Sequence, residues 1–184
     1  MAMTPSNMLT LGTTAPDFNL IDTVSDELVN LQTLKGENGT VIMFICNHCP
    51  FVIHVNPMLV ELATEFQRKG INFIAISSND IHKYPQDGPG LMKRKANEEG
   101  YPFPYLFDDT QEVAKAYDAA CTPDFYLFDG NLKLTYRGQL DDSRPENGIP
   151  LTGSDLKKAI NTLLEGGAML EIQKPSMGCN IKWA

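Results

Sequence analysis

Residues 39–78 constrain the fold most, because two uncharged runs flank one helical pattern. The run GTVIMFIC (39–46) is rich in β-branched and aromatic residues, and INFIAISS (71–78) repeats that composition. Such runs indicate strands that are buried on both faces of a sheet. Residues 50–69 place apolar side chains three or four apart, which predicts an amphipathic helix. A strand–helix–strand unit of this kind predicts two parallel strands in an α/β sheet.

The remaining elements extend this sheet. The residues 124–128 and 132–138 flank a turn at Asp129 and predict a β-hairpin, which makes the sheet mixed. We expect residues 1–14 and 79–90 to be irregular. A capping box at Asp109 and Glu112 predicts the start of a helix that runs through Tyr117. The other predicted elements are short strands at 18–20, 28–31 and 103–107, and helices at 91–99 and 154–165.

Length and charge limit the class of protein. The 184 residues suit one domain with one core, and the net charge of −8 argues against nucleic acid or an anionic membrane as partner. No apolar run approaches the roughly 18–20 residues of a membrane helix. The start lacks the basic and apolar regions of a signal peptide, so we expect a cytoplasmic protein. Four cysteines are too few for a disulfide scaffold, so a close pair favours catalysis or metal binding.

The stretch FICNHCPF (44–51) holds such a pair. Cys46 and Cys49 lie where a buried strand ends and a helix begins. Unpaired N–H groups at a helix start stabilise a thiolate, which predicts a lowered pKa for Cys46. His48 lies between the two cysteines, and in its protonated form it would stabilise the thiolate further. A stabilised thiolate favours the reduced state, so the disulfide would be more oxidising.

Metal binding is the main alternative that the residues leave open. A structural zinc site needs about four ligands. His54, His82, Cys121 and Cys179 are the other candidates, and each stands alone in the sequence. Thiolates also suit copper(I), although no Met-rich segment approaches the pair. We therefore expect no metal.

The stretch CTPDFYLFD (121–129) is the second informative one, because Thr122 and Pro123 lead directly into an apolar strand. Together with the Cys46–Cys49 unit, GTTAPDF (12–18) and the ending GCNIKW (178–183), it resembles the thioredoxin-like superfamily. The resemblance is to its redoxin branch, which includes the AhpC/TSA-type and TlpA/ResA-type proteins.

This resemblance implies an α/β fold with a central mixed sheet, helices on both faces and an N-terminal extension. The domain would span residues 1–166 and a C-terminal tail residues 167–184. The implied activity is thiol–disulfide exchange without an organic cofactor. Cys46 would be the exposed nucleophile and Cys49 the resolving thiol, and the two would form the redox-active disulfide.

The resemblance also implies a substrate position. Thr122-Pro123 would be a cis peptide, and the backbone of Thr122 would pair with an extended substrate. Asn47, Thr122 and Pro123 are thus the expected substrate contacts. The expected partners are protein or small-molecule disulfides and thiols, together with an unidentified reductant or oxidant. The chain would be a monomer or weak dimer.

Two departures from the thioredoxin pattern stand out. Residues 40–45 contain no acidic residue, and Ile45 stands where a tryptophan usually precedes the first cysteine. The buried acid of thioredoxins helps to deprotonate the resolving cysteine. We hypothesise that His48 replaces it in part.

A thiol peroxidase is the alternative within the same superfamily. Peroxiredoxins carry Pro-x-x-x-Thr-x-x-Cys, but Ile42 and Cys46 stand at those positions relative to Cys49, and Gly39 and Met43 relative to Cys46. Arg137 is a candidate for the remote arginine of that family. It is equally interpreted as the end of a hairpin beside a solvated loop.

Two other cysteines are candidate accessory thiols. Cys121 is either a second resolving thiol or, as we favour, a small buried hydrophobe. Cys179 lies in the tail, where it could form a disulfide with Cys46, pair with another subunit, or remain a thiol anchored by Trp183. We expect His54 to face solvent, and Asp141 and Asp142 to be solvated.

Overall fold

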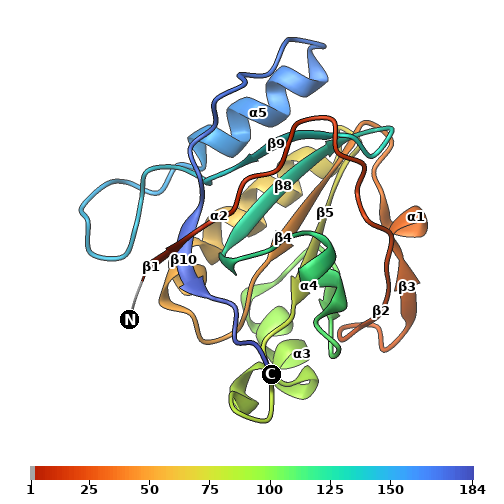
Figure 1. Ribbon diagram of the computed structural model, residues 1–184, viewed down its shortest axis with the longest axis vertical. Helices are drawn as coiled ribbons and strands as arrows, with labels where there is room; N and C mark the ends of the chain where they lie inside the picture. Colours follow the sequence, from red (N-terminus) through yellow and green to blue (C-terminus); the bar gives the residue numbers. More distant parts are fainter. Residues whose placement is uncertain (1–2) are drawn as a thin grey trace.

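A seven-stranded mixed sheet forms the centre of the molecule (Figure 1). The computed structural model describes residues 3–184. The strand order is β3-β2-β6-β5-β4-β8-β9. β4 pairs in parallel with β5, and β5 with β6, whereas the other neighbours are antiparallel. The strands are β2 (Asn19–Asp22), β3 (Leu28–Asn30), β4 (Gly39–Phe44), β5 (Ile71–Ser77), β6 (Tyr105–Phe107), β8 (Asp124–Asp129) and β9 (Leu134–Gly138).

Helices cover both faces of this sheet, as predicted. Alternate residues of β4 enter two different cores, with Val41 and Met43 in one and Ile42 and Phe44 in the other. The first core includes residues of α2, α3 and α5, and the second includes residues of α1 and α4. β4 is therefore buried on both faces, which explains its uncharged sequence. The helices are α1 (Leu31–Leu34), α2 (Pro50–Gln67), α3 (Pro89–Glu99), α4 (Glu112–Ala116) and α5 (Ser154–Leu164), with a 3₁₀ turn, η1, at Pro85–Asp87.

A second sheet of three short antiparallel strands was not predicted. β1 (Met3–Pro5) pairs with β10 (Met177–Asn180), and β10 pairs with β7 (Cys121–Thr122). Figure 1 shows β1 and β10 side by side although they come from opposite ends of the chain. The expectation that residues 1–14 are irregular is wrong for Met3–Pro5. Part of the segment assigned to a C-terminal tail is likewise a paired strand.

The predicted capping box at α4 is also wrong. Gln111 is the N-cap and has a positive φ of 63°, with no side-chain cap hydrogen bond. Asp108, one residue before the proposed box, accepts hydrogen bonds from the backbone N–H groups of Val113 and Ala114. A carboxylate therefore still accepts hydrogen bonds from the N–H groups at the start of α4, but it belongs to the residue directly after β6.

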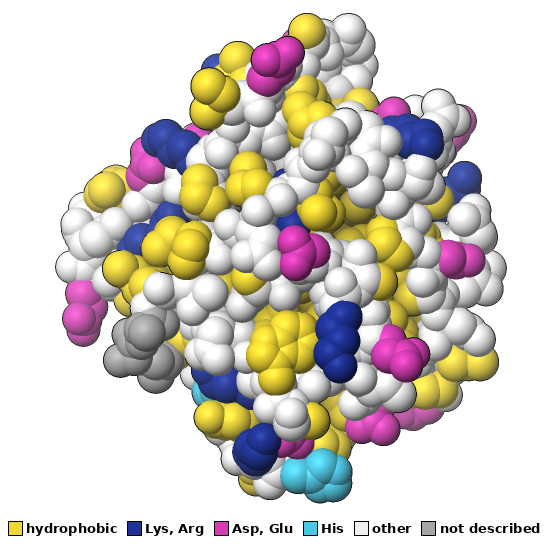
Figure 2. All heavy atoms as spheres, in the orientation of Figure 1, with side chains coloured by type: hydrophobic (Ala, Val, Ile, Leu, Met, Phe, Trp, Pro, Cys, Tyr) yellow, Lys and Arg dark blue, Asp and Glu magenta, His cyan; other side chains and the backbone are white. Residues whose placement is uncertain are grey.

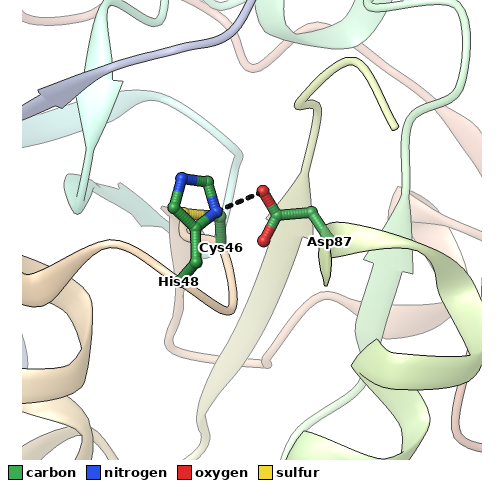
Figure 3. Close-up of side chains that lie close together, drawn as sticks. All are labelled: Cys46, His48 and Asp87. Carbon is green, nitrogen blue, oxygen red and sulfur yellow. Dashed lines mark ion pairs between the residues drawn. The ribbon is translucent and has the colours of Figure 1, made fainter. Parts of the chain in front are cut away.

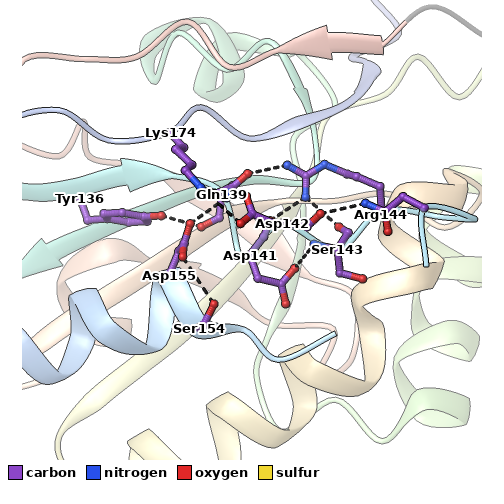
Figure 4. A network of polar contacts seen from close by, with 10 residues as sticks. Tyr136, Gln139, Asp141, Asp142, Ser143, Arg144, Ser154, Asp155 and Lys174 are labelled. Atoms are coloured by element: carbon purple, nitrogen blue, oxygen red, sulfur yellow. Dashed lines mark hydrogen bonds and ion pairs between the residues drawn. The ribbon is translucent and has the colours of Figure 1, made fainter. Parts of the chain in front are cut away.

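The loop after β9 is held by a buried carboxylate (Figure 4). Asp141 is buried and accepts hydrogen bonds from the backbone N–H groups of Ser143, Thr152 and Gly153, so the expectation that it is solvated is wrong. Asp142 is exposed as expected and forms an ion pair with Lys174.

His54 is also placed by this loop. Its side chain is half-buried on α2, and its Nε2 atom lies 2.8 Å from the hydroxyl oxygen of Ser143. The expectation that His54 faces solvent is therefore wrong.

Arg137 lies near the end of the β8–β9 hairpin, as interpreted, but its side chain is fully buried, which was not predicted. Its guanidinium lies 3.1 Å from the Asp124 carboxylate and donates a hydrogen bond to the Asp118 carbonyl. Burial raises the pKa of Asp124, and the positive charge of Arg137 opposes that shift. The pair therefore ties β8 and β9 to the segment after α4.

The surface carries charges of both signs. Figure 2 shows basic and acidic side chains interspersed over one face. Within residues 3–184, no helix is both long enough and apolar enough to cross a membrane.

Candidate active site

Cys46 and Cys49 lie at the junction of β4 and α2, as predicted. Cys49 is the N-cap residue of α2, and its carbonyl accepts hydrogen bonds from the N–H groups of Val52 and Ile53. The side chain of Cys46 is 2% exposed and that of Cys49 is 0% exposed. The expectation of an exposed nucleophile is therefore wrong for this conformation. Both thiols are reduced.

The pKa shifts of the pair favour ionisation of Cys49 over Cys46. A hydrogen bond with Cys46 is the largest contribution that lowers the pKa of Cys49 to about 5, and a second bond with Cys179 adds to it. The same bond raises the pKa of Cys46 well above its usual value, and burial and the charge of Asp87 raise it further. The predicted lowering of the Cys46 pKa is therefore wrong. Cys49 is at the N-cap of α2, where the backbone N–H of Val52 also lowers its pKa by stabilising the thiolate.

A buried acid faces His48 (Figure 3). The Nδ1 atom of His48 lies 2.7 Å from Oδ2 of Asp87, whose side chain is fully buried. Asp87 also accepts hydrogen bonds from the backbone N–H of Asn47 and the amide of Asn79. The ring of Tyr84 stacks on His48 with centroids 5.4 Å apart. Together these contacts fix the imidazole beside Cys46.

Asp87 is the functional residue that sequence reasoning missed. It lies in η1, inside a stretch that we expected to be an irregular loop. It supplies the buried acid that is missing from residues 40–45, but it approaches from another segment of the chain. The proline before it and the glycine after it in YPQDG (84–88) indicated only a turn.

Cys46, His48 and Asp87 could also hold a metal ion. One potential ligand atom of each lies within 4.8 Å of the others, and no other such cluster occurs among residues 3–184. Three ligands are one fewer than a structural zinc site uses. If a metal binds, a fourth position would remain for water or substrate.

The Thr122-Pro123 peptide bond is cis, as the resemblance implied. The hydroxyl of Thr122 lies 3.6 Å from the Cys46 sulfur, and its carbonyl lies 3.3 Å from the Cys49 sulfur. This peptide therefore contacts both members of the pair. The substrate-binding roles of Thr122 and Pro123 remain predictions.

The side chain of Asn47 is held by the protein. Its carbonyl accepts a hydrogen bond from the Tyr105 hydroxyl, and its amide donates one to the Gln86 carbonyl. A substrate contact by Asn47 remains a prediction. Among the described residues, no hydrogen bond joins Cys121 to the pair, because its buried thiol faces the carbonyls of Pro123 and Ser176. Burial raises the pKa of Cys121.

Cys179 contacts the pair through Cys49. The two sulfurs are 2.9 Å apart, which is longer than the disulfide bond length of about 2.05 Å. β10 places Cys179 directly opposite Thr122 in the three-stranded sheet. The structure therefore brings together three cysteines, and Cys49 is the central one.

Comparison with known proteins identifies the family. The AhpC/TSA family matches residues 11–137, which is more than half of the chain. The chain belongs to the AhpC/TSA family. This membership confirms the resemblance to redoxins and the expectation of an oxidoreductase.

Individual relatives of this AhpC/TSA protein support the same conclusion. It is 28% identical to the thiol-disulfide oxidoreductase ResA of Geobacillus thermodenitrificans over 71% of this chain and 70% of that protein. An uncharacterised conserved protein from Geobacillus kaustophilus is 59% identical, with a TM-score of 0.98 over 100% of this chain and 97% of the other. The thioredoxin domain of a thiol-disulfide oxidoreductase from Bacteroides vulgatus shares the fold, with 20% identity and a TM-score of 0.64 over 84% and 100% of the two chains.

Proposed function

We propose that this protein is a thiol–disulfide oxidoreductase that uses Cys46 and Cys49 as its redox pair. The observation that carries this proposal is the position of both thiols at the start of α2 against the cis Thr122-Pro123 peptide, with the Cys46 sulfur 3.6 Å from the Thr122 hydroxyl and the Cys49 sulfur 3.3 Å from the Thr122 carbonyl. The similarity to ResA supports the same assignment.

The contacts suggest how the pair is activated. The Cys46 thiol lies beside His48, whose ring is oriented by Asp87. A histidine oriented by a carboxylate is a suitable base for a cysteine whose pKa is high. In the proposed reaction, Cys46 loses its proton and attacks one sulfur of a substrate disulfide. Cys49 then attacks the mixed disulfide, which releases the second substrate thiol and leaves a Cys46–Cys49 disulfide.

The test measures the redox pair and the activity together. Cys179→Ser protein, which keeps the pair and lacks the neighbouring thiol, is equilibrated with a series of glutathione redox buffers, alkylated, and analysed by mass spectrometry. We expect a reversible Cys46–Cys49 disulfide with a potential between about −270 and −120 mV. Reduction of insulin with dithiothreitol as electron source should be lost in Cys46→Ser and in Cys49→Ser, and kept in the control Cys121→Ser.

Absence of a reversible Cys46–Cys49 disulfide in Cys179→Ser would contradict the proposal. Peroxide consumption that persists in Cys49→Ser would instead indicate a thiol peroxidase. Stoichiometric zinc or copper in the purified protein would favour a metal site at Cys46, His48 and Asp87.

A further inference from the structure

The C-terminal strand β10 occupies the edge where a substrate is expected to pair. In the three-stranded sheet, Cys179 and Thr122 are directly opposite, and Thr122 precedes the cis proline. Gly178 makes this approach possible, since a Cβ atom there would lie 2.0 Å from the Thr122 carbonyl oxygen. The strand therefore pairs with Thr122 as an extended substrate is expected to do, and it brings Cys179 against Cys49.

The Cys49 sulfur is in direct contact with a third cysteine. It lies 2.9 Å from the Cys179 sulfur, and Cys46 precedes it by three residues at the start of α2. All three side chains are buried, with exposed fractions of 2%, 0% and 3% for Cys46, Cys49 and Cys179. Thiol–disulfide exchange requires a thiol within reach of a disulfide sulfur, and Cys179 meets that requirement at Cys49.

We propose that Cys179 is a third redox-active thiol, which takes over the disulfide from the Cys46–Cys49 pair. This inference rests on the proposed function, because the Cys46–Cys49 disulfide is its starting state. The Cys179 sulfur attacks the Cys49 sulfur, a Cys49–Cys179 bond forms, and the Cys46–Cys49 bond breaks. The proton lost by Cys179 is gained by Cys46, so the step is an isomerisation that needs no further oxidant. The oxidised protein then carries a Cys46 thiol and a buried Cys49–Cys179 disulfide.

The test locates disulfides in the full-length oxidised protein. Wild-type protein is oxidised with glutathione disulfide, alkylated at low pH, and digested without reduction for mass spectrometry. We expect a linked peptide pair that contains Cys49 and Cys179, and alkylation of Cys46 in the same sample. In Cys179→Ser, the linked peptides should be Cys46–Cys49 only, and Cys46 alkylation should fall at least tenfold.

Variants without Cys46 isolate the inner bond. Cys46→Ser should still lose two hydrogens on oxidation and form Cys49–Cys179, as should Cys46→Ser/Cys121→Ser. The double variant Cys46→Ser/Cys179→Ser should form no intramolecular disulfide. Near-ultraviolet circular dichroism checks that each variant is folded. The disulfide map of the wild-type protein tests the inference even if a variant does not fold.

The outcomes separate this inference from the proposed function. If wild type forms only Cys46–Cys49, and Cys46→Ser forms only a glutathione adduct or an intermolecular bond, the role of Cys179 is wrong while the proposed function stands. If Cys179→Ser forms no Cys46–Cys49 disulfide and wild type reduces no insulin, the proposed function fails first.

Discussion

At the scale of single residues, the main feature is that the pKa shifts favour ionisation of Cys49 over Cys46. Cys49 is the N-cap of α2 and contacts the Cys179 thiol, whereas Cys46 lies near the charge of Asp87. The sequence placed both cysteines correctly at the helix start. It could not assign the thiolate, because that depends on Cys179 and Asp87, which approach from distant segments.

The first prediction concerns the pH dependence of this thiolate. Absorbance at 240 nm should show one thiolate in the reduced protein with an apparent pKa of about 5, while burial raises the pKa of Cys179 to about 12. Cys46→Ala should raise the Cys49 pKa by about 1 unit, because a lost hydrogen bond of about 1.4 kcal/mol corresponds to that shift. Cys121→Ala is the matched control and should leave the midpoint unchanged. An identical midpoint in Cys46→Ala would contradict the assignment.

The same shift links stability to pH. An unfolded cysteine has a pKa of about 8.5, so the folded state favours the Cys49 thiolate. Its contribution to the free energy of unfolding should be complete above about pH 8.5 and should be lost as the pH falls through about 5. The raised pKa of Cys46 has the opposite effect on stability. Its contribution to the free energy of unfolding is complete below the pKa of an unfolded cysteine and is lost as the pH rises above that value.

A second prediction at this scale tests Asp87 as a positioning residue. Asp87→Asn keeps the size of the side chain but removes a charge that raises the Cys46 pKa. A lower Cys46 pKa stabilises the reduced form, so the redox potential should become less negative, by about 30 mV for each 1.4 kcal/mol. Equilibration with glutathione measures this shift. Asp109→Asn, which changes an exposed carboxylate, should leave the potential unaltered.

At the scale of elements, the long patterned segments were predictable and the short ones were not. The unit β4-α2-β5 and the β8–β9 hairpin follow from local patterns of apolar residues and from turn residues. β1 and β10 contain only a few residues each, and their pairing joins the two ends of the chain. No local periodicity indicates such a pairing. The burial of Arg137 was missed for a similar reason, because it depends on an ion pair with Asp124 on the neighbouring strand.

The third prediction concerns the contact between β10 and β7. Gly178→Ala would place a Cβ atom against the Thr122 carbonyl, so the strand must shift. We expect a loss of about 1–3 kcal/mol in the free energy of unfolding, measured with urea. We also expect a lower yield of the Cys49–Cys179 disulfide.

Gly90→Ala is the matched control for this substitution. Gly90 lies in α3, and a Cβ atom there meets nothing within 4 Å. Its stability should stay the same or rise by up to about 1 kcal/mol, because alanine favours helix. If Gly178→Ala and Gly90→Ala have the same free energy of unfolding, the close packing of β10 against Thr122 does not contribute to stability as predicted.

At the scale of the whole molecule, the two alternative disulfides close very different loops. Cys46 and Cys49 are neighbours in the sequence, whereas Cys49 and Cys179 are 130 residues apart. The fold itself was predictable as a mixed sheet between helices. The joining of the chain ends beside the redox pair was not, since it requires the three-dimensional positions of β1, β7 and β10.

The fourth prediction compares the stability that each disulfide provides. In the chain-entropy account, a loop of more than 100 residues contributes about 4–5 kcal/mol and a four-residue loop about 2 kcal/mol. Oxidised Cys46→Ser should therefore gain more stability over its reduced form than oxidised Cys179→Ser does. Urea unfolding of the four samples measures both differences. Equal gains would show that the Cys49–Cys179 bond does not constrain the unfolded chain as expected.

The position of β10 in the chain also has a consequence during protein synthesis. Cys179 is translated 130 residues after Cys49, which at about 5–20 residues per second is a delay of roughly 6–26 s. β10 is the last strand to leave the ribosome. A nascent chain therefore exposes Cys46 and Cys49 to the thiols of its surroundings before Cys179 exists. The pair can be covered by β10 only after Cys179 has been translated.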